Sequence, residues 1–250
     1  MWDRSFLYLQ LKEADELKLS VVIPCYNEAD NIPLILKRFQ EVIGDRNIQV
    51  VLVNNGSTDN SEEILEKLLP AYAFASVVRV PINKGYGYGI LEGLKHADGD
   101  FLGWTHADMQ TDPNDIVRAW ELIKANGENP NIFVKGNRQG RPLVDKFFSI
   151  GMGLFESIYL GKFLWEINAQ PNIFSRKFYC ELRNPPYDFS FDLYILYMAK
   201  IKRQDIKRIT VEFPQRMHGT SKWNTSVMAK WKFIKRTLSF SLRLKNGGFY

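Results

Sequence analysis

The sequence has 250 residues, of which 45% are hydrophobic and 24% charged, an ordinary composition for a globular protein with a sizeable core. Its two cysteines, Cys25 and Cys180, are too few for a disulfide framework. The first residues do not read as a charged-then-apolar leader followed by a cleavage site. Composition therefore excludes a disulfide scaffold and predicts a cytoplasmic protein.

The formal net charge of +5 is unevenly distributed along the chain. From Lys200 onward, 13 Lys and Arg stand against two acids, so this part carries +11 whereas the first 199 residues carry −6. A basic end of this kind indicates an anionic partner. Its cations are mixed with apolar residues and no nucleic-acid motif accompanies them. We therefore expect phosphate or an anionic membrane surface, and no nucleic acid.

Continuous apolar runs alternate with helical patterns over the first half of the chain. Residues 19–23 and 48–53 are apolar almost throughout, as in strands buried on both faces, and a helical spacing follows each run. Alternating strands and helices predict parallel pairing in a doubly wound α/β sheet. The expected strands are 19–23, 48–53, 76–80, 101–105 and 132–135, and the expected helices are 31–43, 61–69, 88–96 and 113–124.

Four loops at the carboxyl ends of these strands are polar and rich in Gly, Asn and Asp. In open α/β sheets, ligands bind in the crevice at this end of the strands. We therefore expect the functional site at residues 24–30, 54–60, 83–87 and 106–112.

Two long segments with apolar faces follow once the alternation ends after Asn137. Residues 147–165 are the most apolar stretch, but Glu156 at the centre makes a membrane span costly, so we expect a buried or interfacial helix. Residues 227–245 predict a basic amphipathic helix. This second helix fits a membrane surface and a core-packing position equally well. Its apolar stripe consists of Val227, Trp231, Ile234, Leu238 and Leu242.

A small acidic cluster follows the strand at 101–105. Mg²⁺ and Mn²⁺ prefer oxygen ligands and usually bind through one or two carboxylates together with substrate phosphates. Asp108 can supply a carboxylate oxygen and Gln110 an amide oxygen. Taken alone, the cluster is better explained as a solvated turn, with Asp112 and Pro113 beginning a helix.

Four motifs occur in order along the chain, namely VVIPCYNE at 21–28, VNNGSTD at 53–59, NKGYGYG at 83–89 and HADMQ at 106–110. Their order and spacing resemble family 2 glycosyltransferases, chiefly the branch of dolichyl-phosphate mannose synthases and bacterial polyprenyl-phosphate sugar transferases. Further matches lie at 169–176, 189–196 and 216–224. The resemblance implies a GT-A (Rossmann-like) α/β fold with a mostly parallel central sheet flanked by helices. We accordingly divide the chain into an N-terminal extension (1–18), a GT-A domain (19–225) and a basic amphipathic C-terminal helix (226–250).

The resemblance also implies inverting transfer from a nucleotide-diphospho-sugar with help from Mg²⁺ or Mn²⁺. It makes Asp108 and Gln110 the metal ligands, and it places Arg216 and Lys222 over the diphosphate, where cations stabilise the charge on the departing nucleotide. Ser57 and Asp59 also fit a helix cap, and Arg216 and Lys222 also fit a merely basic tail. The implied donor-binding residues are Pro24, Tyr26, Glu28, Asn55, Ser57, Asp59, Lys84, Gly85, His106, Ala107, Asp108, Arg216 and Lys222.

The chain departs from the family pattern at two places. Asn54 and Asn55 stand where two aspartates are usual, and an Asn can donate as well as accept hydrogen bonds, so we expect an altered preference for the base. His106 replaces the first acid of the family's Asp-x-Asp-x-Gln motif, which predicts weaker metal binding or more reliance on diphosphate oxygens. The Gly85, Gly87, Gly89 spacing and its place after the third strand exclude an NAD fingerprint, and we expect close backbone approach to the donor there.

The acceptor is open between two chemical classes. Arg138 and Ser149 occupy places comparable to those of residues that grip the acceptor phosphate in lipid-phosphate sugar synthases, and a second basic residue aligns near Asp145 and Lys146. A phosphate is already ionised, whereas a sugar hydroxyl needs a general base, for which we expect Asp192. A solvent-facing helix position explains Asp192 equally well. The acceptor is thus a polyprenyl phosphate or lipid-linked glycan at the cytoplasmic membrane face, or else a soluble sugar hydroxyl. A degenerate nucleotide-binding protein without turnover is the remaining alternative.

Overall fold

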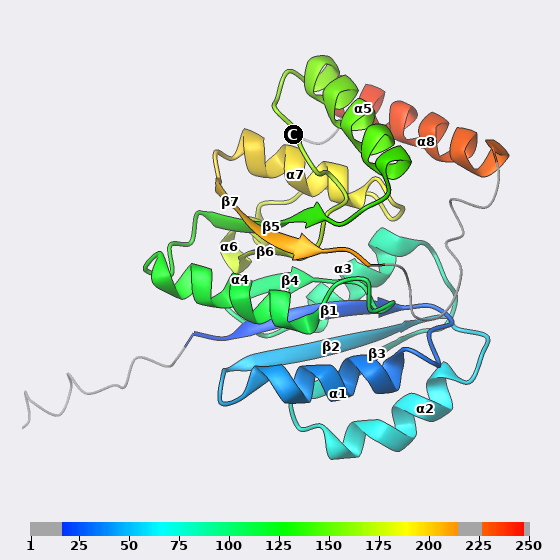
Figure 1. The fold of residues 1–250 in the computed structure, drawn as a ribbon, viewed down its shortest axis with the longest axis vertical. Helices are drawn as coiled ribbons and strands as arrows, with labels where there is room; N and C mark the ends of the chain where they lie inside the picture. The colour runs from blue at the N-terminus through cyan, green and yellow to red at the C-terminus, as the bar shows by residue number, and fades with distance from the viewer. Residues whose placement is uncertain (1–16, 215–226, 248–250) are drawn as a thin grey trace, which may run out of the picture.

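The computed structural model describes residues 17–214 and 227–247, which form one sheet with helices on both faces (Figure 1). The strands are β1 (Leu19–Cys25), β2 (Ile48–Asn55), β3 (Ala75–Val80), β4 (Phe101–Trp104), β5 (Ile132–Gln139), β6 (Asn172–Ser175) and β7 (Asp205–Glu212). The helices are α1 (Ile32–Ile43), α2 (Ser61–Leu68), α3 (Tyr86–His96), α4 (Pro113–Ala125), α5 (Leu143–Leu160), α6 (Arg176–Cys180), α7 (Phe191–Ile201) and α8 (Val227–Lys245), with a short 3₁₀ turn at Leu69–Ala71.

The seven-stranded sheet has the order β3-β2-β1-β4-β6-β5-β7. Pairing is parallel from β3 to β4, and β5 pairs with β7 in parallel as well. β6 lies between β4 and β5 and is antiparallel to both. All five expected strands are present, but β4 and β5 are not neighbours as a simple doubly wound sheet requires. The short strand β6 separates them, and four residues are too few to show a clear pattern in the sequence.

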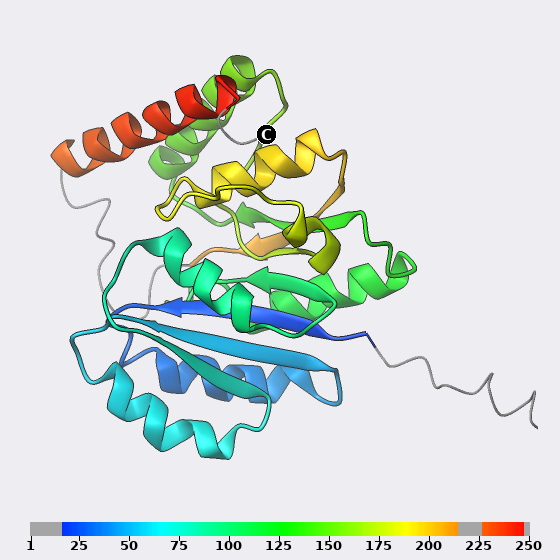
Figure 2. The ribbon, with the colours of Figure 1, turned by 180° about the vertical axis from the view of Figure 1, so that it is seen from behind.

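Two helical layers enclose the sheet (Figures 1 and 2). Val21 and Ile23 of β1 belong to a core cluster with α1 and α4, whereas Val22 belongs to the cluster on the opposite face with α3, α6 and α7. Successive side chains of a strand point to opposite faces, so a strand buried on both sides reads as a continuous apolar run. This explains why the sequence predicted β1 and β2 correctly.

α5 and α8 lie side by side beyond α7 (Figure 1). The hydroxyl of Ser241 donates to the buried carboxylate of Glu156 over 2.7 Å, which joins the two helices and explains the acid at the centre of α5. The face of α8 that packs on the core contains Thr237, Phe240, Ser241 and Leu244. The prediction that the apolar stripe of this helix packs against the core is therefore wrong for Leu242, whose side chain is 52% exposed. The side chains of residues 227–234 lie outside the described part.

Neither α5 nor any other helix within the described ranges combines the length and apolar character of a membrane-crossing segment. α5 nevertheless presents apolar side chains outward, with Leu143 83%, Phe147 76%, Leu154 60% and Ile158 75% exposed. These positions are four, seven and four residues apart, close to one or two helical turns, and so share one side of the helix. Of the two expectations for this segment, the interfacial one fits the exposure and the buried one does not.

Candidate functional site

The loops after β1 and β2 are tied together at the carboxyl end of the sheet. The backbone N–H of Asn27 donates to Ser57 Oγ over 3.1 Å, and the side-chain oxygen of Asn27 accepts from the Thr58 N–H over 2.8 Å. The backbone N–H of Ala29 donates to Asp59 Oδ2 over 3.2 Å. Of the expected donor residues, Ser57 and Asp59 therefore shape the loop that follows Pro24 and Tyr26.

Asp59 also holds the start of α2. Its Oδ1 accepts from the backbone N–H of Ser61 over 3.1 Å and from the Ser61 hydroxyl over 2.6 Å. Burial favours the protonated carboxyl, but the hydrogen bonds from Ser61 and Ala29 outweigh it and lower the pKa of Asp59. The nearby carboxylate of Glu28 accepts from Asn31 over 2.6 Å at the start of α1. Asp59 and Glu28 thus both take part in helix starts, and their roles toward a donor remain predictions.

Asn54 and Asn55 use their amides inside the protein. Asn54 accepts from the Ser57 N–H over 3.1 Å and donates to Glu62 Oε2 over 2.6 Å. An aspartate at position 54 would place two carboxylates in contact, so Glu62 explains the amide there. Asn55 donates to the carbonyl oxygen of Gly85 over 3.0 Å, which links the end of β2 to the glycine loop.

The glycine loop packs closely against the segment that precedes α7. A Cβ on Gly85, whose φ is 125°, would lie 2.3 Å from the carbonyl oxygen of Tyr187, and one on Gly87 would lie 2.5 Å from that of Pro186. A Cβ on Gly89 would lie 2.8 Å from the Asn55 amide nitrogen. The close approach seen here is to the protein's own chain, and the expected approach to a donor remains a prediction. Lys84 is exposed, with its Nζ 5.0 Å above the Tyr88 ring.

The acidic loop after β4 has one buried and one capping carboxylate. Asp108 is buried, follows the buried Ala107, and accepts from the Gln110 N–H over 3.2 Å, so a wholly solvated turn is wrong for it. Asp112 caps α4 by accepting from the Asn114 N–H over 2.9 Å, as the turn interpretation predicted. The side-chain amide of Gln110 donates to the carbonyl oxygen of Pro214 over 3.0 Å.

The chemistry of this loop fits a divalent cation that is held largely by its substrate. Within residues 17–214 and 227–247, no group of three or more His, Cys, Asp and Glu side chains forms a complete metal cage. Mg²⁺ and Mn²⁺ commonly take one or two carboxylates and complete their shell with phosphate oxygens and water. Asp108, with the amide oxygen of Gln110, meets that lower requirement.

Asp192 lies inside the protein, at the start of α7. It is 3% exposed and accepts from the side-chain amides of Gln170 over 3.1 Å and Asn172 over 3.4 Å. Burial raises its pKa, while the positive charge of Lys135 and the imidazole of His106 oppose that rise. The solvent-facing interpretation is therefore wrong. The centre of the Tyr86 ring lies 6.1 Å from that of the His106 ring. The Tyr86 ring also stacks on Phe189, with 4.9 Å between the ring centres.

Lys135 is a fully buried cation on β5 that the motifs did not indicate. Its Nζ donates to Asn172 Oδ1 over 2.6 Å and to the carbonyl oxygen of Ala169 over 2.9 Å. Burial lowers the pKa of Lys135 to about 7, although the carboxylate of Asp192 acts in the opposite direction. Asn172 therefore joins a cation and an acid that stand far apart in the sequence.

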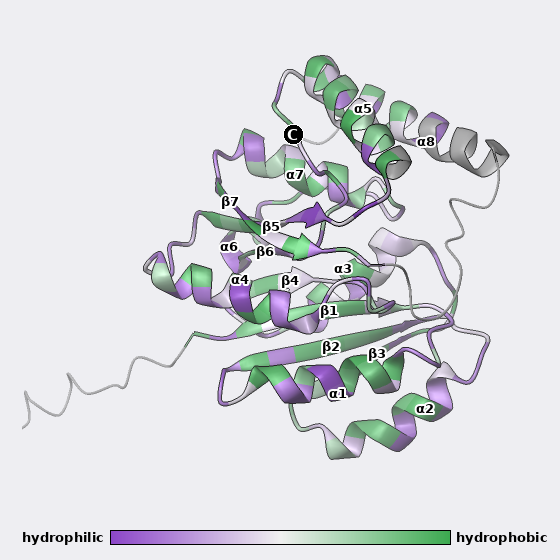
Figure 3. Cartoon of the chain, viewed as in Figure 1, coloured by the Kyte–Doolittle hydropathy of each residue, from purple (hydrophilic) through white to green (hydrophobic). Residues whose placement is uncertain are grey.

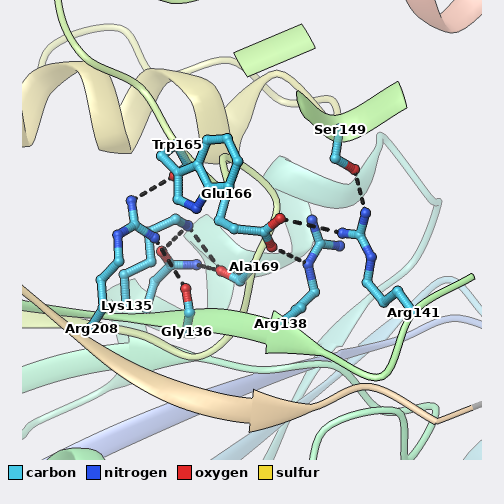
Figure 4. Close-up of polar contacts among 10 residues, drawn as sticks. Lys135, Gly136, Arg138, Arg141, Ser149, Trp165, Glu166, Ala169 and Arg208 are labelled. Carbon is cyan, nitrogen blue, oxygen red and sulfur yellow. Dashed lines mark hydrogen bonds and ion pairs between the residues drawn. The ribbon is translucent and has the colours of Figure 1, made fainter. Parts of the chain in front are cut away.

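A second cluster surrounds Glu166 (Figure 4). Arg138 Nε lies 2.7 Å from Glu166 Oε2, and Arg141 Nη1 lies 3.6 Å from Glu166 Oε1. The exposed fraction of the side chain is 10% for Arg138, 6% for Arg141 and 8% for Glu166. Arg141 also donates to Ser149 Oγ over 2.7 Å. The structure thus brings Arg138 and Ser149 together, as expected, through Arg141. Lys146, near which a second basic residue was expected, is exposed, and the roles of Arg138 and Ser149 toward an acceptor remain predictions.

Arg208, on β7, holds the backbone next to this cluster. Lys135 and Arg208 are register partners on the parallel strands β5 and β7, which places the two cations side by side. The guanidinium of Arg208 donates to the carbonyl oxygens of Gly136 over 3.1 Å and Trp165 over 2.5 Å. Since this contact depends on strand pairing, no sequence motif could have found it. The expected diphosphate residues Arg216 and Lys222 lie outside the described residues.

A model of glycosyl transferase family 2 matches residues 20–176. The chain belongs to this family. Among curated relatives, it is 32% identical over 150 residues to a dolichol-phosphate mannosyltransferase of Pyrococcus furiosus, covering 58% of this chain and 42% of the relative. It is 34% identical over 128 residues to an undecaprenyl-phosphate 4-deoxy-4-formamido-L-arabinose transferase of Klebsiella pneumoniae, covering 49% of this chain and 38% of the relative. The family 2 chain thus spans less than half the length of either relative.

Solved structures of similar shape confirm the fold. Glucosyl-3-phosphoglycerate synthase from Mycobacterium tuberculosis, in complex with Mn²⁺, UDP and glucosyl-3-phosphoglycerate, has a TM-score of 0.67 at 17% identity, covering 92% of this chain and 80% of that one. A mannosyltransferase from Pyrobaculum calidifontis, in complex with GDP-Man and Mn²⁺, has a TM-score of 0.67 at 16% identity, covering 92% and 65%. At these identities the similarity shows the fold alone, and the fold of this family 2 chain is GT-A.

Proposed function

We propose that this protein is an inverting glycosyltransferase that moves a sugar from a nucleotide-diphospho-sugar to a polyprenyl phosphate, acting peripherally at an anionic membrane surface. The observation that carries the proposal is the partly buried cluster of Arg138, Arg141 and Ser149 beside the start of α5, a helix with exposed apolar side chains. A polyprenyl phosphate has two matching parts, a phosphate head group for the arginines and a hydrocarbon chain for the apolar side of α5.

The charge of this cluster supports an anionic ligand. Among the described residues, Arg138 and Arg141 both face the single carboxylate of Glu166 (Figure 4). Lys135 and Asp192 offset each other nearby. Guanidinium groups bind phosphate oxygens through paired, charge-assisted hydrogen bonds. A phosphate that replaced the Glu166 carboxylate would bind the same two guanidinium groups.

The exposed side of α5 supports a lipid acceptor over a soluble phosphate. α5 is among the most hydrophobic helices of the molecule (Figure 3), and Leu143, Phe147, Leu154 and Ile158 leave much of that hydrophobicity in contact with solvent. An exposed apolar patch of this kind marks an interaction site. Cations flank it, since Lys162 is exposed and Lys245 lies 4.4 Å above the Tyr159 ring, and cations near an apolar face favour anionic lipid.

The relatives and structural neighbours support the donor class. Two curated relatives are named for transfer to dolichol phosphate or undecaprenyl phosphate, and two structural neighbours hold UDP or GDP-Man with Mn²⁺. We expect the nucleotide in the loops of Tyr26, Asp59 and Asp108 at the carboxyl end of the sheet. Asp108 and Gln110 would hold Mg²⁺ or Mn²⁺, which would supply positive charge to the leaving diphosphate.

In the proposed reaction, an oxygen of the acceptor phosphate attacks the anomeric carbon of the sugar. The bond from that carbon to the donor's diphosphate breaks, and its electron pair leaves with the nucleoside diphosphate. Attack from the opposite side inverts the anomeric configuration. The nucleophile is already ionised and needs no general base. Arg138, Arg141 and Ser149 would therefore position the acceptor and leave its protonation unchanged.

A second candidate is transfer to a sugar hydroxyl, with Asp192 as the general base. The observation that favours it is the burial of Asp192, which raises its pKa and so its affinity for a proton. In this reaction Asp192 would take the hydroxyl proton as the new bond forms. The phosphate acceptor accounts for more of the molecule, because the hydroxyl reaction has no need of the arginine cluster or of the exposed side of α5.

The test uses the purified full chain with vesicles that contain anionic phospholipid and undecaprenyl phosphate. Labelled UDP-Glc and GDP-Man are supplied with Mn²⁺, and sugar is measured in the lipid extract. Arg141→Gln should raise the KM for the lipid about tenfold and leave the donor KM unchanged, because it removes one charge-assisted contact. Arg46→Gln, which removes a surface partner of Glu121, is the matched control.

Other outcomes would separate the alternatives. Transfer only to water-soluble sugars, with no labelled lipid, would contradict the proposal and favour the hydroxyl acceptor. Nucleotide binding without transfer to any acceptor, with and without Mn²⁺, would favour the non-catalytic nucleotide-binding protein.

A further inference from the structure

Glu166 occupies the position at which an acceptor phosphate would bind the arginines. Its two carboxylate oxygens face Arg138 and Arg141, at 2.7 Å and 3.6 Å from the nearest guanidinium nitrogens (Figure 4). Carboxylate and phosphate compete for the same forked donors of arginine. A phosphate that reaches this cluster therefore meets a negative charge already paired with its ligands.

The backbone around Glu166 is held in place while the side chain reaches into the cluster. The guanidinium of Arg208 donates to the carbonyl oxygen of Trp165, the residue before Glu166, over 2.5 Å. Glu166 itself has a φ of 48°, in the left-handed region that non-glycine residues rarely adopt. Such strain persists where the surroundings impose it, and it is concentrated at functional sites. The loop thus aims this carboxylate at the arginines at a cost in backbone energy.

We propose that Glu166 is a built-in competitor of the acceptor phosphate, which the substrate displaces and which in turn displaces the product. This inference rests on the proposed function. The side chain has three rotatable bonds between its fixed backbone and the carboxylate, so the charged end can leave the arginines without movement of the loop.

The chemistry of the reaction gives the competitor a direction. The acceptor is a phosphate monoester and carries up to two negative charges, whereas the product is a phosphodiester and carries one. The dianion outcompetes a single carboxylate for Arg138 and Arg141. After the sugar is attached, the phosphodiester has lost one charge and one acceptor oxygen, and the Glu166 carboxylate returns to the guanidinium groups. Glu166 thus lowers the affinity for both ligands by the same factor, so that the more strongly bound monoester still displaces it and the diester is released more readily.

The test compares two amphiphiles, dodecyl phosphate and methyl dodecyl phosphate, which differ in the charge that distinguishes substrate from product. Their dissociation constants are measured by calorimetry on the full chain, below the micellar concentration. Glu166→Gln keeps the shape of the side chain and removes its charge. We expect it to bind both amphiphiles about tenfold more tightly, because an internal competitor that must leave first weakens every ligand of the arginines by the same factor.

Activity adds a second readout with undecaprenyl phosphate vesicles. Glu166→Gln should lower both the acceptor KM and the inhibition constant of the glycosylated lipid, and leave the donor KM unchanged. Glu166→Asp, whose shorter side chain cannot reach both arginines, should shift all these values in the same direction, and it serves if the Gln variant fails to fold. Glu181→Gln, which removes a surface partner of Lys202, is the control.

Two outcomes would contradict the proposal that Glu166 competes with the acceptor phosphate. Weaker binding of both amphiphiles in both variants would mean that Glu166 orients the arginines, and unchanged binding would mean that it has no part in recognition. If the unaltered protein binds neither amphiphile and labels no lipid, the proposed function itself fails, which is a distinct result.

Discussion

The side-chain amide nitrogen of Gln170 lies 3.1 Å from Oδ1 of Asp192 and holds that carboxylate inside the protein. Gln170 lies just before β6, and Asp192 lies in the first turn of α7, so the contact joins two segments that are distant in the sequence. The same nitrogen lies 3.1 Å from the hydroxyl oxygen of Tyr86 at the start of α3. Asp192 is therefore a fixed, buried group, and its role can be tested with little change in shape.

Asp192→Asn should separate the two acceptor classes. We expect transfer to undecaprenyl phosphate to stay within a few-fold of the unaltered protein, because an ionised phosphate needs no base. Transfer to a sugar hydroxyl should fall by about 10²- to 10⁴-fold, the usual contribution of a general base. Initial rates with saturating donor measure both, and Asp205→Asn at the exposed start of β7 is the control. Loss of lipid labelling with acceptor binding intact would assign Asp192 a direct part in the phosphate reaction.

His106→Asp should strengthen metal activation. It restores the acid that family 2 enzymes usually have two residues before Asp108, and a second carboxylate raises affinity for a hard cation. We expect the Mn²⁺ concentration for half-maximal activity to fall on the order of tenfold. A Mn²⁺ titration of the transfer rate after treatment with a chelator measures this.

His96→Asp is the matched control, since it makes the same change on the exposed end of α3. An unchanged Mn²⁺ requirement in His106→Asp would show that the loop after β4 does not hold the cation.

Gly87→Ala and Gly151→Ala should change stability in opposite directions. Both glycines are helical, but a Cβ on Gly87 would lie 2.5 Å from the carbonyl oxygen of Pro186, whereas one on Gly151 meets nothing within 4 Å. Crowding against backbone should reduce the free energy of unfolding by about 1–3 kcal/mol at Gly87. Alanine should raise it by about 0.5–1 kcal/mol at Gly151. Urea unfolding of both variants provides the measurement, and equal effects would show that the glycine loop can shift away from residues 186–188.

Asp115→Asn should stabilise the protein at neutral pH and not at acid pH. Burial raises the pKa of Asp115 from 3.8 to about 6, against the pull of Arg118. The folded carboxyl therefore binds its proton more tightly than the unfolded one, and stability falls as pH rises from about 4 to 6. The variant lacks this loss, so at pH 7 it should be more stable by about 1 kcal/mol after allowance for solvent screening.

Urea unfolding at pH 4 and pH 7 tests this dependence, with Asp45→Asn at an exposed position as the control. A difference between Asp115→Asn and the unaltered protein that stays constant across this range would show that the Asp115 carboxyl is not the group responsible.

The sequence alone sufficed for the elements that carry a strong local signal. β1 and β2 are buried on both faces and so appear as continuous apolar runs, and the bounds of α8 agree with its predicted range. The loops after β1, β2 and β4 could be placed at one end of the sheet because parallel strands share their direction. The four motifs identified the family, which the match to residues 20–176 confirmed.

Only the tertiary structure decided which side chains lie around Glu166. Arg138 and Arg141 lie three residues apart in the chain, but Glu166 comes from the loop before β6. Arg208, which donates to the neighbouring Trp165 carbonyl oxygen, comes from β7. They meet because antiparallel β6 lies between β4 and β5, and because β7 pairs with β5 in a register that sets Arg208 beside Lys135. Local patterns record which face of an element is apolar, whereas the meeting of distant charges depends on strand order and register. That is why the sequence determined the family and the fold class, and the folded chain alone gathered Arg138, Arg141 and Glu166.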